Sequence, residues 1–198
     1  MRRASVSILG VLGILAAACG SRPSGDERGA EMSAKTPSNT TTTNAATTRR
    51  VESPAFENNA TIPDDYAARG RNVSPPLSWS AGPTGTVSYA LIVDDLDTPA
   101  GTWVHWTLWN LTTTRLDEDA ARPARGQAGA VSGKNSWSKR GYGGPDPPSG
   151  THRYYFRVYA IDTMLELSND ADRTALDAAM SGHVLASGEL MGKYSAKK

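Results

Sequence analysis

The chain has 198 residues, and its 21 Lys and Arg nearly balance 20 Asp and Glu, which gives a formal net charge of +1 at pH 7. Its cations are scattered rather than gathered into a basic stripe, which argues against nucleic acid as a partner. Cys19 is the single cysteine, so no disulfide can form within the chain. The length is enough for one ordinary domain.

The N-terminus has the features of a targeting segment. Arg2 and Arg3 precede a short apolar run, and Ala16-Ala17-Ala18-Cys19 resembles a bacterial lipoprotein cleavage site. We therefore expect residues 1–18 to be a lipoprotein signal peptide and Cys19 to carry the lipid of an exported, membrane-anchored protein. The alternatives are an ordinary signal peptide and a short membrane anchor, although the apolar run is short for a bilayer.

Residues 19–50 are rich in Ser, Thr, Pro, Asn and charge. Such a composition cannot bury enough apolar surface to fold, so we expect a disordered tether. The folded domain is then expected to occupy residues 51–198.

Two stretches of the domain alternate as β-strands do, at residues 87–94 and 103–111. In the second, regular alternation places His105 with Trp103 on one face and Trp106 on the other. Leu77-Ser78-Trp79 is a shorter strand candidate, because a Pro pair precedes it and its apolar residues alternate.

Residues 152–161 are aromatic and β-branched, which predicts a further strand. A helix should follow, with Ser168 or Asn169 as its N-cap and Gly182 at its end. Residues 183–186 and 189–194 are expected to form a last pair of strands. The pattern alone predicts a mainly β, antiparallel sandwich with one late helix.

Polar groups gather at the ends of these strands. Asp95 and Asp97 follow the first strand, His105 lies in the next, and a Gly/Pro-rich loop over residues 141–150 leads to His152 and Tyr154. Strand-end loops on one edge of a sandwich cluster, so we expect these side chains to meet there. The plainer alternative for His105 is a core histidine hydrogen-bonded to backbone.

These residue types are compatible with several chemistries. Asp95, Asp97, His105 and His152 are metal-ligating types, but no tight spacing such as H-x₃-H occurs. Nucleophilic catalysis lacks a Gly-x-Ser-x-Gly elbow, and its only cysteine is assigned to the lipid. An aspartyl phosphatase pattern fails because Pro99 stands where Thr or Val is required. Binding of an anion by His, Tyr and backbone N–H groups remains.

Two motifs carry a family resemblance. Asp95-Leu96-Asp97-Thr98-Pro99 resembles the Asp-Pro-Asp-Ala-Pro motif of the phosphatidylethanolamine-binding proteins, also called Raf-kinase-inhibitor-like proteins. The segment from Gly143-Gly144-Pro145 to His152-Arg153-Tyr154 resembles their second motif, Gly-x-x-Pro-Pro…His-Arg-Tyr. Residues 53–56, 72–79 and 182–186 are similar to the bacterial YbhB/YbcL branch. The resemblance covers residues 51–194.

The resemblance implies an antiparallel β-sandwich with a few short flanking helices and a small pocket for phosphate-like anions or phospholipid head groups. By motif position, the ligand-binding residues would be Asp95, Asp97, Pro99, His105, Gly143, Gly144, His152 and Tyr154. Leu96 departs from the motif's Pro, and Asp146 adds a negative charge to the glycine loop. The resemblance also suggests a cis Thr98–Pro99 bond.

We therefore expect an exported, lipid-anchored binding protein that is not an enzyme and needs neither cofactor nor metal. Its partners would be a small anion or phospholipid head group and the membrane, reached through the N-terminal lipid. A homodimer and an unidentified protein partner stay open. The alternatives are a protein-interaction inhibitor of a kinase or hydrolase with a vestigial pocket, and a weak hydrolase using Asp95 and His105.

Overall fold

The computed structural model describes residues 47–122 and 129–197. The predicted signal peptide, Cys19 and most of the tether lie outside these ranges. β1 starts at Thr47, before the predicted domain start at residue 51. Within the described ranges no helix is long and apolar enough to cross a membrane.

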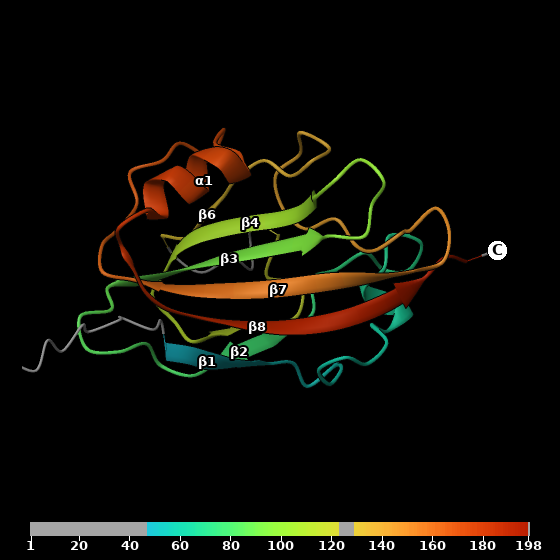
Figure 1. Cartoon of the computed structure of the whole chain (residues 1–198), viewed down its shortest axis with the longest axis horizontal. Coiled ribbons are helices and arrows are strands. Elements are labelled where there is room, and N and C mark those ends of the chain that lie inside the picture. Colours follow the sequence, from blue (N-terminus) through green and yellow to red (C-terminus); the bar gives the residue numbers. More distant parts are fainter. Residues whose placement is uncertain (1–46, 123–128, 198) are drawn as a thin grey trace, which may run out of the picture. The chain divides into compact units, whose positions relative to one another are not determined.

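The domain is mainly β, as predicted, with eight strands in the order β5-β2-β1-β8-β7-β3-β4-β6 (Figure 1). The strands are β1 (Thr47–Glu52), β2 (Leu77–Trp79), β3 (Ser88–Asp95), β4 (Trp103–Leu111), β5 (Arg115–Leu116), β6 (Val131–Ser132), β7 (Thr151–Ile161) and β8 (Val184–Ser195). A 3-10 turn, η1 (Asp64–Tyr66), and one helix, α1 (Arg173–Met180), accompany them. Neighbouring strands are antiparallel except β1 and β8, which are parallel.

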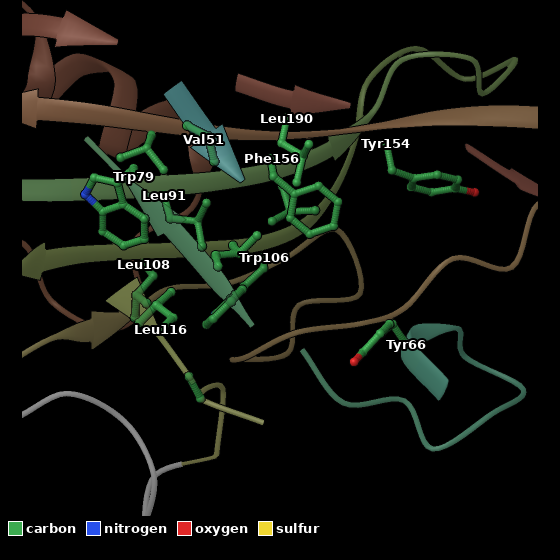
Figure 2. Close-up of a cluster of buried hydrophobic side chains, with 14 of the residues drawn as sticks. Val51, Tyr66, Trp79, Leu91, Trp106, Leu108, Leu116, Tyr154, Phe156 and Leu190 are labelled. Carbon is green, nitrogen blue, oxygen red and sulfur yellow. The ribbon is translucent and has the colours of Figure 1, made fainter. Parts of the chain in front are cut away.

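The sheet curls over its main core. Trp79 of β2 and Leu116 of β5, from one end of the strand order, pack in the same cluster as Trp106 of β4, near the other end. Figure 2 shows these side chains facing Leu91 of β3. The apolar faces of both ends are thereby removed from water, which is the main stabilising contribution in such a fold.

β3 is buried on both faces. Leu91 belongs to the main core, whereas Ile92 packs in a second cluster with Leu176 and Met180 of α1. The helix lies beside β4 and β6 in Figure 1, so it covers the face of the sheet opposite the main core.

An ion-pair network joins α1 to the end of β3. The Asp94 carboxylate is buried and lies 2.6 Å from Arg157 Nη1 of β7 and 2.6 Å from Arg173 Nη1 of α1. Asp94 thus points toward the helix, and its neighbour Asp95 must point to the other face of β3, toward the main core.

Two expectations for the C-terminal part were wrong. Asp172, not Ser168 or Asn169, caps α1, because its side chain accepts a hydrogen bond of 2.9 Å from Ala175 N. Ser168 Oγ accepts instead from Asp170 N within the preceding turn. β8 is one continuous strand, not two, because it stays paired with β7 across Gly188.

β4 spans the predicted residues 103–111, but its alternation is broken. Val93 lies opposite Trp106 and Asp94 opposite Val104, so His105 is an extra residue, a β-bulge. The bulge turns His105 to the side of Trp106: the His105 ring contacts Tyr154, and Trp106 packs in the same cluster as Tyr154. The prediction that His105 and Trp106 face opposite ways was therefore wrong.

Candidate functional site

Four of the predicted site residues lie together on the main-core side of the sheet, at one end of its central strands. Asp95, the last residue of β3, is paired in register with Tyr154 of β7. His152 lies two residues earlier on the same face of β7, and the bulge in β4 brings the His105 ring to 5.2 Å from the Tyr154 ring, between centroids. We call these four residues the polar cluster: Asp95, His105, His152 and Tyr154.

The polar cluster is buried. The exposed fractions of its residues are 2% for Asp95, 3% for His105, 6% for His152 and 1% for Tyr154. In Figure 2 the Tyr154 ring stands apart from the densely packed apolar side chains. Buried polar groups need hydrogen-bond partners. The hydrogen bonds within the cluster therefore determine which donor and acceptor atoms remain available to a ligand.

Asp95 holds His152. Its Oδ2 lies 2.7 Å from His152 Nδ1, and its Oδ1 accepts from Asp97 N at 2.9 Å. A carboxylate accepts, so Nδ1 carries a proton and Nε2 of His152 is left for a ligand. The expectation that Asp95 orients a histidine is confirmed, and that histidine is His152.

His105 is bonded to backbone. Its Nδ1 lies 2.6 Å from the carbonyl oxygen of Gly143, so Nδ1 donates. Burial lowers the pKa of His105, which favours the neutral ring. The plainer alternative, a core histidine bonded to backbone, thus holds for Nδ1, while Nε2 keeps no partner within the described residues.

Tyr154 keeps its hydroxyl proton. Burial, followed by the negative charge of Asp95 and hydrogen bonding of the hydroxyl to that carboxylate, raises the pKa of Tyr154. The hydroxyl is therefore a neutral donor at physiological pH.

Gly143 and Gly144 of the glycine loop do not present bare N–H groups, contrary to expectation. Gly143 N donates to His105 O at 3.0 Å, and Gly144 N donates to Asn72 Oδ1 at 2.7 Å. A Cβ on Gly144 would lie 2.3 Å from Tyr66 O. Gly144 is therefore required by close packing against the backbone after η1, and not by the approach of a ligand.

Asp97 and Pro99 lie outside the buried cluster. Asp97 Oδ2 accepts from Arg153 N at 2.8 Å and from Arg153 Nε at 2.9 Å. These hydrogen bonds lower the pKa of Asp97 to about 2. Pro99 is exposed in the following turn, and the Thr98–Pro99 bond is trans, so the cis expectation was wrong.

Four of the predicted residues line two separate cavities, and the other four, Asp95, Pro99, His105 and Tyr154, line neither of them. Asp97 and His152 line one together with Lys193, whereas Gly143 and Gly144 line another together with Trp137. Among the described residues no group of three or more His, Cys, Asp or Glu side chains is placed to hold a metal ion.

Sequence reasoning missed Asn72 and Trp137. The Trp137 ring packs edge-on against His105, with centroids 5.1 Å apart, while 43% of the residue stays exposed. Asn72 has φ 53°, a left-handed conformation that Asn tolerates better than most residues, and this aims its side chain at the glycine loop. A tryptophan within a polar loop was the only signal for Trp137.

The comparison with known families decides the identity of the fold. Residues 52–195 match the family described as phosphatidylethanolamine-binding protein. The chain belongs to this family. The match covers nearly all of the described domain.

Relatives of this family in other organisms are similar over the same region. A UPF0098 protein from Methanothermobacter thermautotrophicus is 44% identical over 142 residues, 71% of this chain and 94% of that protein. A UPF0098 protein from Chlamydia muridarum is 41% identical over 152 residues, 73% of this chain and 97% of that protein.

Two solved structures share the fold. A putative phosphatidylethanolamine-binding protein homologue from Chlamydia trachomatis, CT736, has a TM-score of 0.69 at 38% identity, covering 76% of this chain and 99% of that one. Escherichia coli YbcL, described as a new member of the mammalian PEBP family, has a TM-score of 0.71 at 31% identity, covering 75% and 99%. The predicted β-rich family fold is confirmed.

Proposed function

We propose that this phosphatidylethanolamine-binding-protein domain is a non-catalytic binding module that holds a small oxyanion or a phosphate head group at the polar cluster. The observation that supports this most is the Asp95–His152 hydrogen bond of 2.7 Å in a buried site. It fixes the ring so that Nε2 is the only free nitrogen of His152. A ring held in one orientation within a buried site is suited to the recognition of a small ligand.

The charges of the site fit this role. Both oxygens of Asp95 accept hydrogen bonds within the protein, Oδ2 from His152 Nδ1 and Oδ1 from Asp97 N, so this carboxylate is held away from the ligand. The Tyr154 hydroxyl remains protonated and can donate. Lys193 lines the cavity at His152 and adds a positive charge on the approach.

The lack of an assembled nucleophile supports binding over hydrolysis. The hydrolase alternative combined Asp95 with His105, but Asp95 is hydrogen-bonded to His152. Within the described residues no serine or threonine hydroxyl is hydrogen-bonded to His152 or His105. The described residues therefore do not form the hydrogen-bonded series of nucleophile, general base and orienting carboxylate that nucleophilic catalysis requires.

The N-terminal sequence supports a location for the protein outside the cytoplasm. We propose that the protein is exported and held at the membrane by lipid on Cys19, because the only cysteine of the chain follows an apolar run and three alanines. The module would then meet its ligand outside the cytoplasm.

Titration calorimetry with inorganic phosphate and O-phosphoethanolamine tests the function. Tyr154→Phe removes one donor to an anion, and such a hydrogen bond contributes about 1.5–3 kcal/mol, so affinity should fall roughly tenfold or more. Tyr155→Phe is the matched control: it changes the neighbouring tyrosine on the opposite face of β7 and should leave affinity unchanged.

The same measurement separates the alternatives. Equal affinity in wild type and Tyr154→Phe would show that the anion binds elsewhere. No binding of either compound would favour the protein-interaction inhibitor with a vestigial pocket, and steady release of phosphate from O-phosphoethanolamine would favour the hydrolase.

A further inference from the structure

We infer that the polar cluster selects an oxyanion that retains a proton, because His105 presents a hydrogen-bond acceptor to the ligand. The preferred class would be hydrogenphosphate or a singly protonated phosphate monoester, and the disfavoured class would be sulfate and phosphodiesters. This inference rests on the proposed function: it says which anions the site takes, given that it takes one.

The hydrogen bond of His105 fixes the position of its ring proton. Nδ1 lies 2.6 Å from Gly143 O, and a carbonyl oxygen has no proton to give. Nδ1 is therefore the donor of this pair. A neutral imidazole carries one proton, so Nε2 of the same ring holds a lone pair.

The surroundings favour this neutral ring. His105 is buried, and the rings of Trp137 and Tyr154 pack edge-on against it at centroid distances of 5.1 Å and 5.2 Å. Burial lowers the pKa of His105, although hydrogen bonds with the backbone of Gly143 and Gly144 and the charges of Asp95 and Asp94 act in the opposite direction. The ring thus stays an acceptor at Nε2 where an exposed histidine would begin to protonate.

Nε2 of His105 is open to a ligand. No described residue donates to it. Among the described residues, three side-chain atoms are both fully buried and without a hydrogen-bond partner: Trp79 Nε1, Thr107 Oγ1 and Trp109 Nε1. Nε2 of His105 is not one of them. An unpartnered atom outside that set retains accessible surface, and this one lies on the ring that contacts Tyr154.

An anion bound at Tyr154 and His152 would therefore meet two kinds of group. The Tyr154 hydroxyl can donate to its bare oxygens, whereas His105 Nε2 can only accept. A P–OH group satisfies that acceptor. Sulfate would place an oxygen lone pair against the lone pair of Nε2 and leave a buried acceptor unpaired, which should reduce affinity by about tenfold or more.

The acceptor at His105 Nε2 would also discriminate between phosphate esters. A phosphate monoester has a second pKa of about 6, so its singly protonated form is accessible near neutral pH. A phosphodiester has no P–OH at any physiological pH. A site that needs a proton from its ligand would thus favour monoesters and free phosphate over the diester of a phospholipid.

The test compares inorganic phosphate with sulfate at mildly alkaline pH, where both are mainly dianions of similar size and only phosphate keeps a proton. Calorimetry on the full chain should show phosphate binding at least about tenfold more tightly than sulfate. His105→Asn keeps an N–H group near Nδ1 but is too short to place an acceptor where Nε2 lies, so phosphate affinity should fall to about that of sulfate. His183→Asn, at the exposed histidine beside Asp162, should keep the wild-type ratio.

The outcomes separate the two levels of the proposal. Equal affinities for phosphate and sulfate in the wild type would overturn the inference and leave the oxyanion site standing, whereas binding of neither anion would overturn the proposed function itself. If His105→Asn does not fold, nitrogen-15 NMR of the wild-type histidines replaces it. A proton on Nδ1 of His105 with Nε2 free supports the inference, and a proton on Nε2 overturns it.

Discussion

His105 shows how one buried side chain makes the stability of the domain depend on pH. Burial lowers the pKa of His105 in the folded protein, whereas the unfolded chain has the ordinary value of about 6.5. The unfolded state therefore binds a proton more readily as the pH falls. The contribution of His105 to the free energy of unfolding is fully present above about pH 6.5, and it is lost as the pH falls below that value.

The predicted measurement is urea unfolding at about pH 7.5 and about pH 5 for wild type and His105→Asn. Between these two pH values the free energy of unfolding of the wild type should fall by up to about 2 kcal/mol more than that of the variant, because one pKa unit corresponds to about 1.4 kcal/mol. Asn cannot titrate but keeps a donor for Gly143 O. Equal losses in the two proteins would mean that His105 titrates normally in the fold.

The sequence predicts which residues meet at the site better than it predicts the hydrogen bonds that they form. Asp95, His152 and Tyr154 meet as expected, because they lie at the ends of neighbouring strands. The role given to Gly144 was wrong, because the need for glycine arises from the backbone of Tyr66, 78 positions earlier in the chain. The residues around Gly144 in the sequence give no indication that the Tyr66 backbone packs against it.

The strands were predicted more accurately than the interruptions within them. β4 has its predicted bounds, and Tyr89 and Ala90 of β3 lie in opposite core clusters, as their alternation indicated. The bulge at His105 depends on pairing with β3, so a rule based on one strand alone cannot contain it. The helix cap was missed because Ser168, Asn169 and Asp172 are all good N-cap residues.

The helix α1 supplies a testable contact for the sheet. Leu176 is fully buried against Ile92 and Trp109, so Leu176→Ala should destabilise the domain by about 2–5 kcal/mol. Thr174→Ala changes an exposed position on the same helix and should stay within about 0.5 kcal/mol of wild type. Thermal and urea unfolding measure both. A negligible effect of Leu176→Ala would show that the helix does not pack on the sheet.

At the scale of the whole molecule, the boundary between tether and domain can be measured by truncation. A chain that begins at Ala46 keeps all of β1, whereas one that begins at Val51 loses the parallel pairing of Thr47–Arg50 with β8. The first should unfold within a few degrees of the longer protein and the second at a clearly lower temperature. Equal melting of the two would show that this pairing adds no stability.

The membrane anchor gives a prediction for the complete precursor. Cys19→Ser removes the only thiol available for a lipid, so the protein should move from the detergent phase to the aqueous phase or stay unprocessed. Detergent partition and mass spectrometry of the N-terminus measure this. Unchanged partition of the variant would exclude Cys19 as the anchor.

The two adjacent carboxylates at the end of β3 also protect the protein from misfolding. Asp94 is neutralised by Arg157 and Arg173 on one side of the sheet, and Asp95 is bonded to His152 on the other. If β3 slipped by one residue, either Val93 would face the two guanidinium groups or Leu96 would face His152. Each error would leave charge without its partner, so strand slippage is penalised by electrostatics as well as by the loss of apolar packing.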